Sequence, residues 1–326
     1  MVSVTPPLPQ PPADRTRPAV LIFANCQGED IRNVMASVEP LREAYEFKLI
    51  AYHVLNQPWG GWENYGPGFM SNVETLWYQE GPDFPQERAR LHEALPADIR
   101  TIRFPSPSML SLWPLAGGDQ RREPEELYPD GRYPRVDYVA AQLAADLAGQ
   151  DLSDDSIFDR YMEMSAQRLP NLDRRLAIDI ARWQQRDAIV DIPVGEYLHD
   201  SFREVPLFHT WTHLTAEPVR FLAKRLCETT FADTADLEQL ASAIDALLAF
   251  HTGQDFEQTP VHPLVAQHFG LAWYRPDALY RFHSHEWTFR DYIVHLIRHA
   301  PYCRESDIGV AETALATQAG ELGDEL

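Results

Sequence analysis

Four consecutive residues near the start of the chain, Asn25-Cys26-Gln27-Gly28, combine a thiol with two side-chain amides and a glycine. They follow an apolar run at 19–23 and precede a segment whose apolar residues recur at helical spacing. Backbone N–H groups at the start of a helix stabilise a thiolate and can hold an anion or a developing oxyanion. Asn25 and Gln27 would add amide donors, and Gly28 would let the backbone approach a ligand closely. The pattern predicts a nucleophilic thiol, with a buried structural cysteine as the alternative.

Two histidines, His209 and His213, form a second group that could do chemistry. They precede a stretch with helical periodicity, so we place them at a strand-to-helix junction. In three-layer α/β transfer and hydrolytic enzymes, a histidine from such a late junction meets a nucleophile that follows the first strand. A metal site and a structural role remain alternatives. The position three residues before His213, where an acid would complete a triad, is Thr210.

The elements that must position these residues alternate between strands and helices, which predicts an α/β fold whose first strand is central and parallel. We expect an irregular loop at 57–69 and a break in the long helical pattern at Leu169-Pro170-Asn171. The expected strands are 19–23, 47–54, 99–104 and 205–209. The expected helices begin at Glu29 and also cover 87–95, 136–148, 157–185, 216–227, 237–250 and 289–299.

The domain organisation follows from the distribution of proline and charge. Five prolines before residue 13 predict a disordered arm over 1–17, and the acidic end predicts a flexible tail over 301–326. Between them we expect a single α/β domain over 18–300. A helical insert, about 118–190, would lie beside its core.

Composition excludes several classes of function. The formal net charge of −21 opposes binding to nucleic acid, and no run of 18 apolar residues could span a membrane. Three cysteines without a secretory signal favour the cytoplasm. Nucleotide-binding glycine motifs and paired Cys-x-x-Cys are absent, and His283-Ser-His285-Glu286 lacks a matching distant set, so no metal is expected.

Three segments together resemble the WcbI-type polysaccharide biosynthesis enzymes: Asn25-Cys26-Gln27-Gly28 after an apolar strand, Ile102-Arg-Phe-Pro105-Ser106, and residues 209–213 before an amphipathic helix. The likeness covers roughly 18–299. It implies a three-layer, mainly parallel fold similar to SGNH hydrolases and flavodoxin, with a helical C-terminal region. It also implies a protein that binds coenzyme A or acetyl-coenzyme A and acetylates a capsular or other surface sugar.

The resemblance assigns roles to individual residues. Cys26 occupies the position of the SGNH nucleophile, and His213 matches the late histidine. Because Thr212-His213-Leu214 departs from the expected Asn-His-Pro, His209 is an alternative base. The backbone N–H of Gln27 would stabilise the oxyanion.

Basic residues near these segments could bind the phosphates of coenzyme A, because guanidinium and ammonium groups pair with phosphate. The candidates are Arg100, Arg103, Lys224 and Arg225, with ordinary surface solvation as the alternative. Aromatic residues of the loop could stack on a sugar or on adenine, or simply pack the loop: Trp59, Trp62, Tyr65 and Phe69. A carbohydrate esterase and a non-catalytic carbohydrate- or coenzyme-binding protein remain alternatives to the acyltransferase.

Overall fold

A computed structural model describes residues 17–55, 68–70, 72–81, 85–116, 137–147, 149–233, 235–251, 253–283 and 285–298. Most of the predicted arm, the predicted acidic tail, Cys303, and Trp59, Trp62 and Tyr65 of the predicted loop lie outside these residues. No helix within them is long and apolar enough to cross a membrane.

The chain divides into two compact units. We call them the sheet unit, which comprises residues up to Phe104 together with Ala223–Leu247, and the helical unit, which comprises Pro105–Leu222 and the residues from Leu248 onward. The described part of the predicted insert, residues 137–147 and 149–190, lies within the helical unit, which extends beyond it in both directions.

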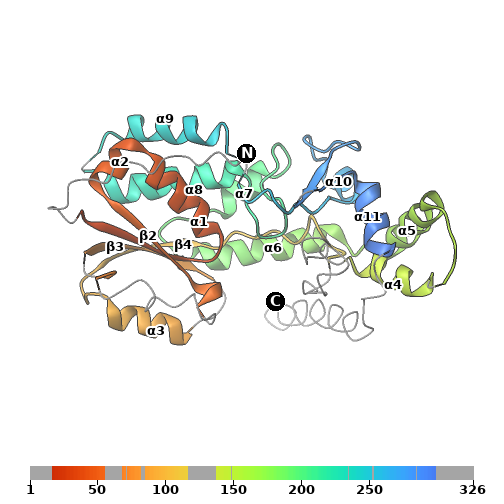
Figure 1. Cartoon of the computed structure of the whole chain (residues 1–326), viewed down its shortest axis with the longest axis horizontal. Helices are drawn as coiled ribbons and strands as arrows, with labels where there is room; N and C mark the ends of the chain where they lie inside the picture. Colours follow the sequence, from red (N-terminus) through yellow and green to blue (C-terminus); the bar gives the residue numbers. More distant parts are fainter. Residues whose placement is uncertain are drawn as a thin grey trace, which may run out of the picture. The chain divides into compact units, whose positions relative to one another are not determined.

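A four-stranded sheet forms the centre of the sheet unit (Figure 1). The strands are β1 (Ala19–Ala24), β2 (Glu46–Ala51), β3 (Val73–Glu80) and β4 (Arg100–Pro105), in the order β2-β1-β3-β4. β1 pairs in parallel with β2 and β3, and all six of its residues are buried. A continuous apolar run suits such a strand, because helices cover both faces of a parallel sheet.

One face of the sheet packs against α3 (Pro85–Ala94), so that Leu91 joins a core with Phe23 and Tyr78. The opposite face packs against α1 (Gln27–Ser37). On that face the indole N–H of Trp77 donates to Thr230 Oγ1 at 2.9 Å, near the end of α8 (Ala216–Phe231). The sheet unit therefore has three layers, as predicted. Shorter or outer elements are α2 (Glu39–Ala44), the 3-10 turn η1 (Tyr52–Val54) and α9 (Leu237–Leu248).

The helical unit has its own apolar core, to which α4 (Tyr138–Asp146), α5 (Asp154–Arg168) and α11 (Phe289–Arg298) contribute. Side-chain caps begin four of its helices: Asp137 for α4, Ser153 for α5, Asn171 for α6 and His262 for α10 (Pro263–Phe269). The remaining elements are α6 (Leu172–Asp187), α7 (Gly195–Ser201) and an antiparallel hairpin of β5 (Tyr280–Phe282) and β6 (His285–Trp287).

The predicted elements agree with most of the observed ones. The long helical pattern breaks into α5 and α6 at Leu169-Pro170-Asn171, and α8 begins at Ala216, as expected. The strand expected at 205–209 was wrong, because only an isolated bridge between Phe208 and Leu214 forms there. The elements that were not predicted are α2, η1, β3, α7, α10 and the β5–β6 hairpin.

Candidate functional site

The turn after β1 lies where ligands bind in open α/β sheets. β2 and β3 flank β1 on opposite sides, so the direction of the sheet order reverses between β1 and β3. The crevice at the carboxyl ends of strands on either side of such a reversal is the usual ligand site, as in the flavodoxin-like order. Cys26 follows the carboxyl end of β1, and Gln79 stands near the carboxyl end of β3. The topology therefore places the predicted thiol at this crevice.

Cys26 is the N-cap residue of α1 and is partly exposed. It makes no side-chain capping bond, so its thiol is not used to begin the helix. The Asn25 side chain instead satisfies the turn, because its Oδ1 accepts the Gln27 N–H at 2.9 Å, while the Asn25 carbonyl accepts the Gly28 N–H at 3.0 Å. The predicted oxyanion donor, the Gln27 N–H, is thus already engaged within the turn. It could turn to an oxyanion only if the Asn25 side chain moved.

Gln79 holds this turn through a buried network that sequence reasoning missed. Its Oε1 accepts the Asn25 N–H at 2.9 Å and the Tyr52 hydroxyl at 3.1 Å. Its Nε2 donates to Gln27 Oε1 at 2.8 Å. Gln79 and Gln27 are each 1% exposed, so the two side-chain amides hold the Cys26 turn from the protein interior and do not face solvent. The predicted role of the Gln27 amide is therefore partly structural.

Gly28 is required for helix packing. A Cβ placed on it would lie 2.5 Å from Ala24 Cβ, closer than such atoms approach each other, and 3.0 Å from Leu49 Cδ1, which is a tight contact. The missing side chain lets the first turn of α1 rest directly on β1. This differs from the prediction, in which Gly28 would admit a ligand.

Cys227 shows what a structural cysteine looks like in the same unit. Its Sγ lies 3.7 Å from Met35 Sδ, and it is 2% exposed. Burial raises the pKa of the Cys227 thiol to about 12, which keeps it protonated and unreactive. Cys26 differs in exposure and in position at a helix start. Reactive thiols share those two features, whereas a cysteine that serves only packing does not.

The predicted histidines lie on a tight turn of the helical unit. The His209 N–H donates to the His213 carbonyl at 2.8 Å, and Thr210 Oγ1 accepts the His213 N–H at 3.1 Å. Thr210 is fully buried, and its hydroxyl oxygen stabilises the turn by accepting a backbone N–H. The residue at the position where a triad acid was sought therefore has a structural role. His213 is 8% exposed, and its ring centroid lies 5.6 Å from that of Phe256. His209 is more exposed than His213.

The predicted phosphate ligands pair with neighbouring groups in the sheet unit. Lys224 Nζ lies 2.7 Å from Asp245 Oδ1, and Arg225 Nη1 lies 2.6 Å from Glu228 Oε2. Arg103 Nε lies 4.0 Å from Glu80 Oε1, and Arg100 donates to two backbone carbonyls near the end of α8. The carboxylate pairs are at least partly exposed, where an ion pair contributes about 0–1 kcal/mol and exchanges readily.

The described residues contain no group of three or more His, Cys, Asp or Glu that could hold a metal ion. His283 takes a positive φ of 52°, and its ring centroid lies 5.8 Å from that of Phe256. The His285 ring stacks on Trp287 within β6. Ring packing therefore accounts for both histidines of this motif.

Comparison with known proteins identifies a matching family and a solved structure of similar fold. The sequence model of a family described as polysaccharide biosynthesis enzyme WcbI matches residues 19–234. A search of curated proteins finds no match. One solved structure has a TM-score of 0.67 over 93% of this chain and 96% of its own, at 15% identity, which shows a shared fold. It is described as native WcbI, a novel polysaccharide biosynthesis enzyme, without a disulfide bond between coenzyme A and a cysteine.

Proposed function

Because the chain belongs to the WcbI family of polysaccharide biosynthesis enzymes, we propose that it binds coenzyme A and transfers an acyl group, preferably acetyl, to a hydroxyl of a surface-polysaccharide sugar. The observation that carries this proposal is the partly exposed Cys26 thiol at the start of α1, beside the sheet reversal. The related solved structure is described as lacking a disulfide bond between coenzyme A and a cysteine, and this mention of the two thiols together supports placing the coenzyme thiol against Cys26.

Cys26 has two chemically distinct routes. As a nucleophile, its thiolate attacks the thioester carbonyl, the coenzyme thiolate leaves, and the sugar hydroxyl then displaces Cys26 from the acyl group. As a binding residue, it lines the thioester pocket while the sugar hydroxyl attacks directly. The helix dipole favours the thiolate in the first route, and in both routes the Gln27 N–H stabilises the developing oxyanion once the Asn25 side chain has released it.

A base must take the proton of the sugar hydroxyl, and we assign this role to His213, with His209 as the alternative. General-base assistance of this kind contributes about 10²–10⁴-fold. Loss of that assistance should lower kcat more than it changes the affinity for coenzyme A. His213→Gln, with His209→Gln beside it, therefore identifies the base by its effect on kcat.

The phosphates of coenzyme A need local positive charge in a chain of net charge −21. We propose Arg103, Lys224 and Arg225 as their ligands. Each must exchange a neighbouring carboxylate for phosphate, and ion pairs at exposed sites exchange at little cost. Affinity for coenzyme A should therefore fall as salt rises, because salt screens exposed charges.

Calorimetric titration with coenzyme A and acetyl-coenzyme A, at low and moderate salt, tests the proposal. Cys26→Ser and the matched core variant Cys227→Ala separate the site from a general loss of structure. We expect saturable, salt-sensitive binding that weakens with Cys26→Ser and persists with Cys227→Ala. If coenzyme A does not bind at either salt concentration, the transferase is excluded, and release of acyl groups from acylated sugars would identify an esterase.

Coenzyme A disulfide probes the thiol directly. Attack by the Cys26 thiolate forms a mixed disulfide and releases one equivalent of free coenzyme A, so sulfurs and electrons balance. Mass spectrometry of digested protein should find coenzyme A on the Cys26 peptide and none on the Cys227 peptide. Acetyl-coenzyme A in the same assay separates the two routes, because only the nucleophilic route leaves acetyl on Cys26.

A further inference from the structure

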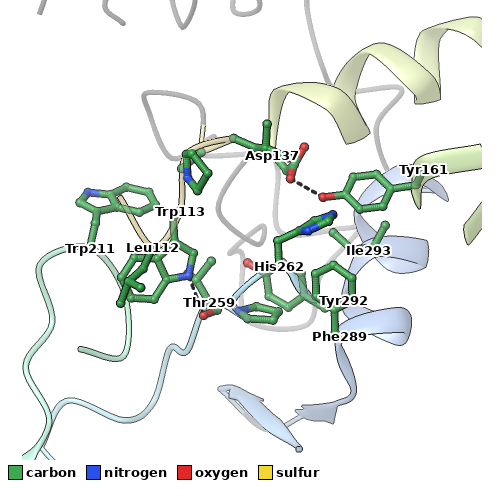
Figure 2. A pocket seen from close by; sticks show the side chains of 14 residues that line it. Leu112, Trp113, Asp137, Tyr161, Trp211, Thr259, His262, Phe289, Tyr292 and Ile293 are labelled. Carbon is green, nitrogen blue, oxygen red and sulfur yellow. Dashed lines mark hydrogen bonds between the residues drawn. The ribbon is translucent and has the colours of Figure 1, made fainter. Parts of the chain in front are cut away.

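The helical unit contains a pocket that the proposed thiol chemistry does not use. The space within the pocket, including the open solvent at its mouth, is about 420 Å³. It lies among the segment before α4, the start of α4, α5, the stretch ending at His262, and α11 (Figure 2). Every residue that lines it belongs to the helical unit.

Aromatic side chains form much of the wall, including Trp113, Trp211 and Phe289. The indole N–H of Trp113 donates to the Thr259 carbonyl at 2.9 Å, so its polar edge is already satisfied within the wall (Figure 2). Aromatic rings offer large apolar surfaces on which a flat ligand face can rest. The wall therefore suits a ligand with a C–H face.

Asp137 brings a carboxylate to this apolar surrounding. Its Oδ1 caps α4 by accepting the N–H groups of Val139 and Ala140 at 2.9 and 3.0 Å, and its Oδ2 accepts the Tyr161 hydroxyl at 2.6 Å (Figure 2). No Lys, Arg or His among the described residues forms an ion pair with Asp137. Oδ2 has accepted one hydrogen bond and can accept another from a ligand hydroxyl.

Thr259 supplies a second polar position. Its Oγ1 is buried and finds no hydrogen-bond partner among the described residues. A buried hydroxyl without a partner is unfavourable, and a hydrogen bond with a ligand hydroxyl would remove that cost. Asp137 and Thr259 therefore bring two hydrogen-bonding residues to a pocket whose lining is mostly apolar.

His262 adds no positive charge. Its Nδ1 accepts the Leu264 N–H at 3.1 Å, so the ring proton is on Nε2, which lies 3.0 Å from Ser165 Oγ. Burial lowers the pKa of His262 to about 4, which keeps the ring neutral near pH 7. The lining residues include neither Lys nor Arg. With one carboxylate and no cation, the pocket opposes phosphorylated or carboxylated ligands.

We propose that this pocket binds one uncharged sugar ring, with a C–H face on the aromatic wall and hydroxyls donated to Asp137 Oδ2 and Thr259 Oγ1. The assignment of this ring to the acyl acceptor rests on the proposed function, whereas sugar binding itself does not. The pocket would then select neutral residues of a polysaccharide over uronic acids and sugar phosphates. A hydroxyl bonded to a carboxylate is the strongest contact in this arrangement.

The test uses the full chain and saturation-transfer NMR with methyl glycosides of glucose, galactose and mannose. Glucuronate, glucose 6-phosphate and tetramethylammonium serve as anionic and cationic comparisons. We expect at least one neutral glycoside to bind with displaceable signal, and both anions to bind at least tenfold more weakly. Absence of binding by all three glycosides, equal binding by the anions, or preferential binding of tetramethylammonium would overturn the proposal.

Variants locate the binding. Asp137→Asn retains an N-cap acceptor but loses the charge, and should weaken glycoside binding about tenfold or more. Thr259→Val removes a hydroxyl and should weaken glycoside binding to a smaller extent. Asp236→Asn is the matched control, because Asp236 Oδ1 also accepts two N–H groups at the start of a helix, in the sheet unit. Thermal unfolding confirms that each variant is folded. Unchanged glycoside affinity in folded Asp137→Asn and Thr259→Val would move the sugar elsewhere.

Titration with coenzyme A in the same samples separates the two proposals. Coenzyme A binding without glycoside binding would reject the pocket and keep the transferase. Glycoside binding without coenzyme A binding would keep the pocket and reject the transferase.

Discussion

The turn after β1 and the pocket of the helical unit differ in how far their polar groups are hydrogen-bonded within the protein. In the turn, Asn25, Gln27 and Gln79 satisfy one another, and the partly exposed thiol of Cys26 is held by an already complete frame. In the pocket, Asp137 has no ion-pair partner and Thr259 Oγ1 has no hydrogen-bond partner among the described residues. A reactive group needs a rigid frame, whereas a site for hydroxyls needs acceptors that the fold has left available.

Removing the frame of the turn should have the largest effect on stability. Gln79→Met removes the acceptor of the Asn25 N–H and the donor to the buried Gln27 Oε1, and should lower the free energy of unfolding by about 2–4 kcal/mol. Urea denaturation measures this. Tyr52→Phe removes only one bond to Gln79 and should cost about 1 kcal/mol. Equal losses in both variants would mean that Gln79 does not organise the turn.

Gly28→Ala tests the spacing between α1 and β1. The added Cβ meets Ala24 Cβ at 2.5 Å, and overpacking of this kind costs about 1–3 kcal/mol. Ala24→Gly removes the other half of the clash, so the double variant should be more stable than the two single losses added together predict. A double-mutant cycle by chemical denaturation gives this coupling. Strict additivity would show that Leu49 or the backbone, rather than Ala24, limits the space.

The titrating residues of the pocket, Asp137 and His262, should have smaller effects on the free energy of unfolding, and these effects depend on pH. Burial raises the pKa of Asp137 from 3.8 to about 6, so between these values the folded chain holds the proton more tightly and stability falls as pH rises. Burial lowers the pKa of His262 from 6.5 to about 4, so in that range stability rises with pH. The contributions oppose each other, at about 1–2 kcal/mol each after allowance for solvent screening.

Single substitutions separate these two opposing contributions to the pH dependence of stability. Asp137→Asn should leave stability that falls more steeply on acidification from pH 6 to pH 4, because only the histidine contribution remains. His262→Asn, which retains an N-cap acceptor, should make stability rise on acidification relative to the parent chain. Denaturation at several pH values measures both. Parallel profiles for the parent and both variants would contradict this account of the pocket.

Local patterns were enough to predict the elements around Cys26. The apolar run of β1, the helical spacing of α1 and the break between α5 and α6 are properties of adjacent residues. β3 was missed because Val-Glu-Thr-Leu-Trp-Tyr-Gln-Glu mixes polar residues into a mostly buried strand. Its burial follows from pairing with β1, which brings Tyr78 beside Phe23. That register depends on residues more than fifty positions apart.

The same reason explains which site residues could be predicted. Cys26 was identified from its immediate neighbours, whereas Gln79 acts on a turn 54 residues away. Thr210 was considered only as a missing acid, and its role in the turn at 209–213 became visible from the backbone hydrogen bonds. Asp137 depends on Tyr161, 24 residues later, and on the surrounding aromatic wall. The charge pairing of Lys224 with Asp245 likewise required the packing of α8 and α9.

The bond from Trp77 to Thr230, across 153 residues of sequence, has a consequence for synthesis on the ribosome. Domains usually fold as units as the chain emerges, with the N-terminal part first. Here the four strands emerge early, but the part of α8 that covers Trp77 emerges only after residues 105–222 of the helical unit. A nascent sheet therefore exposes the apolar surface around Trp77 while more than a hundred residues are translated. The newborn chain needs protection from aggregation for that interval, and truncations that end before Thr230 should depend strongly on chaperones.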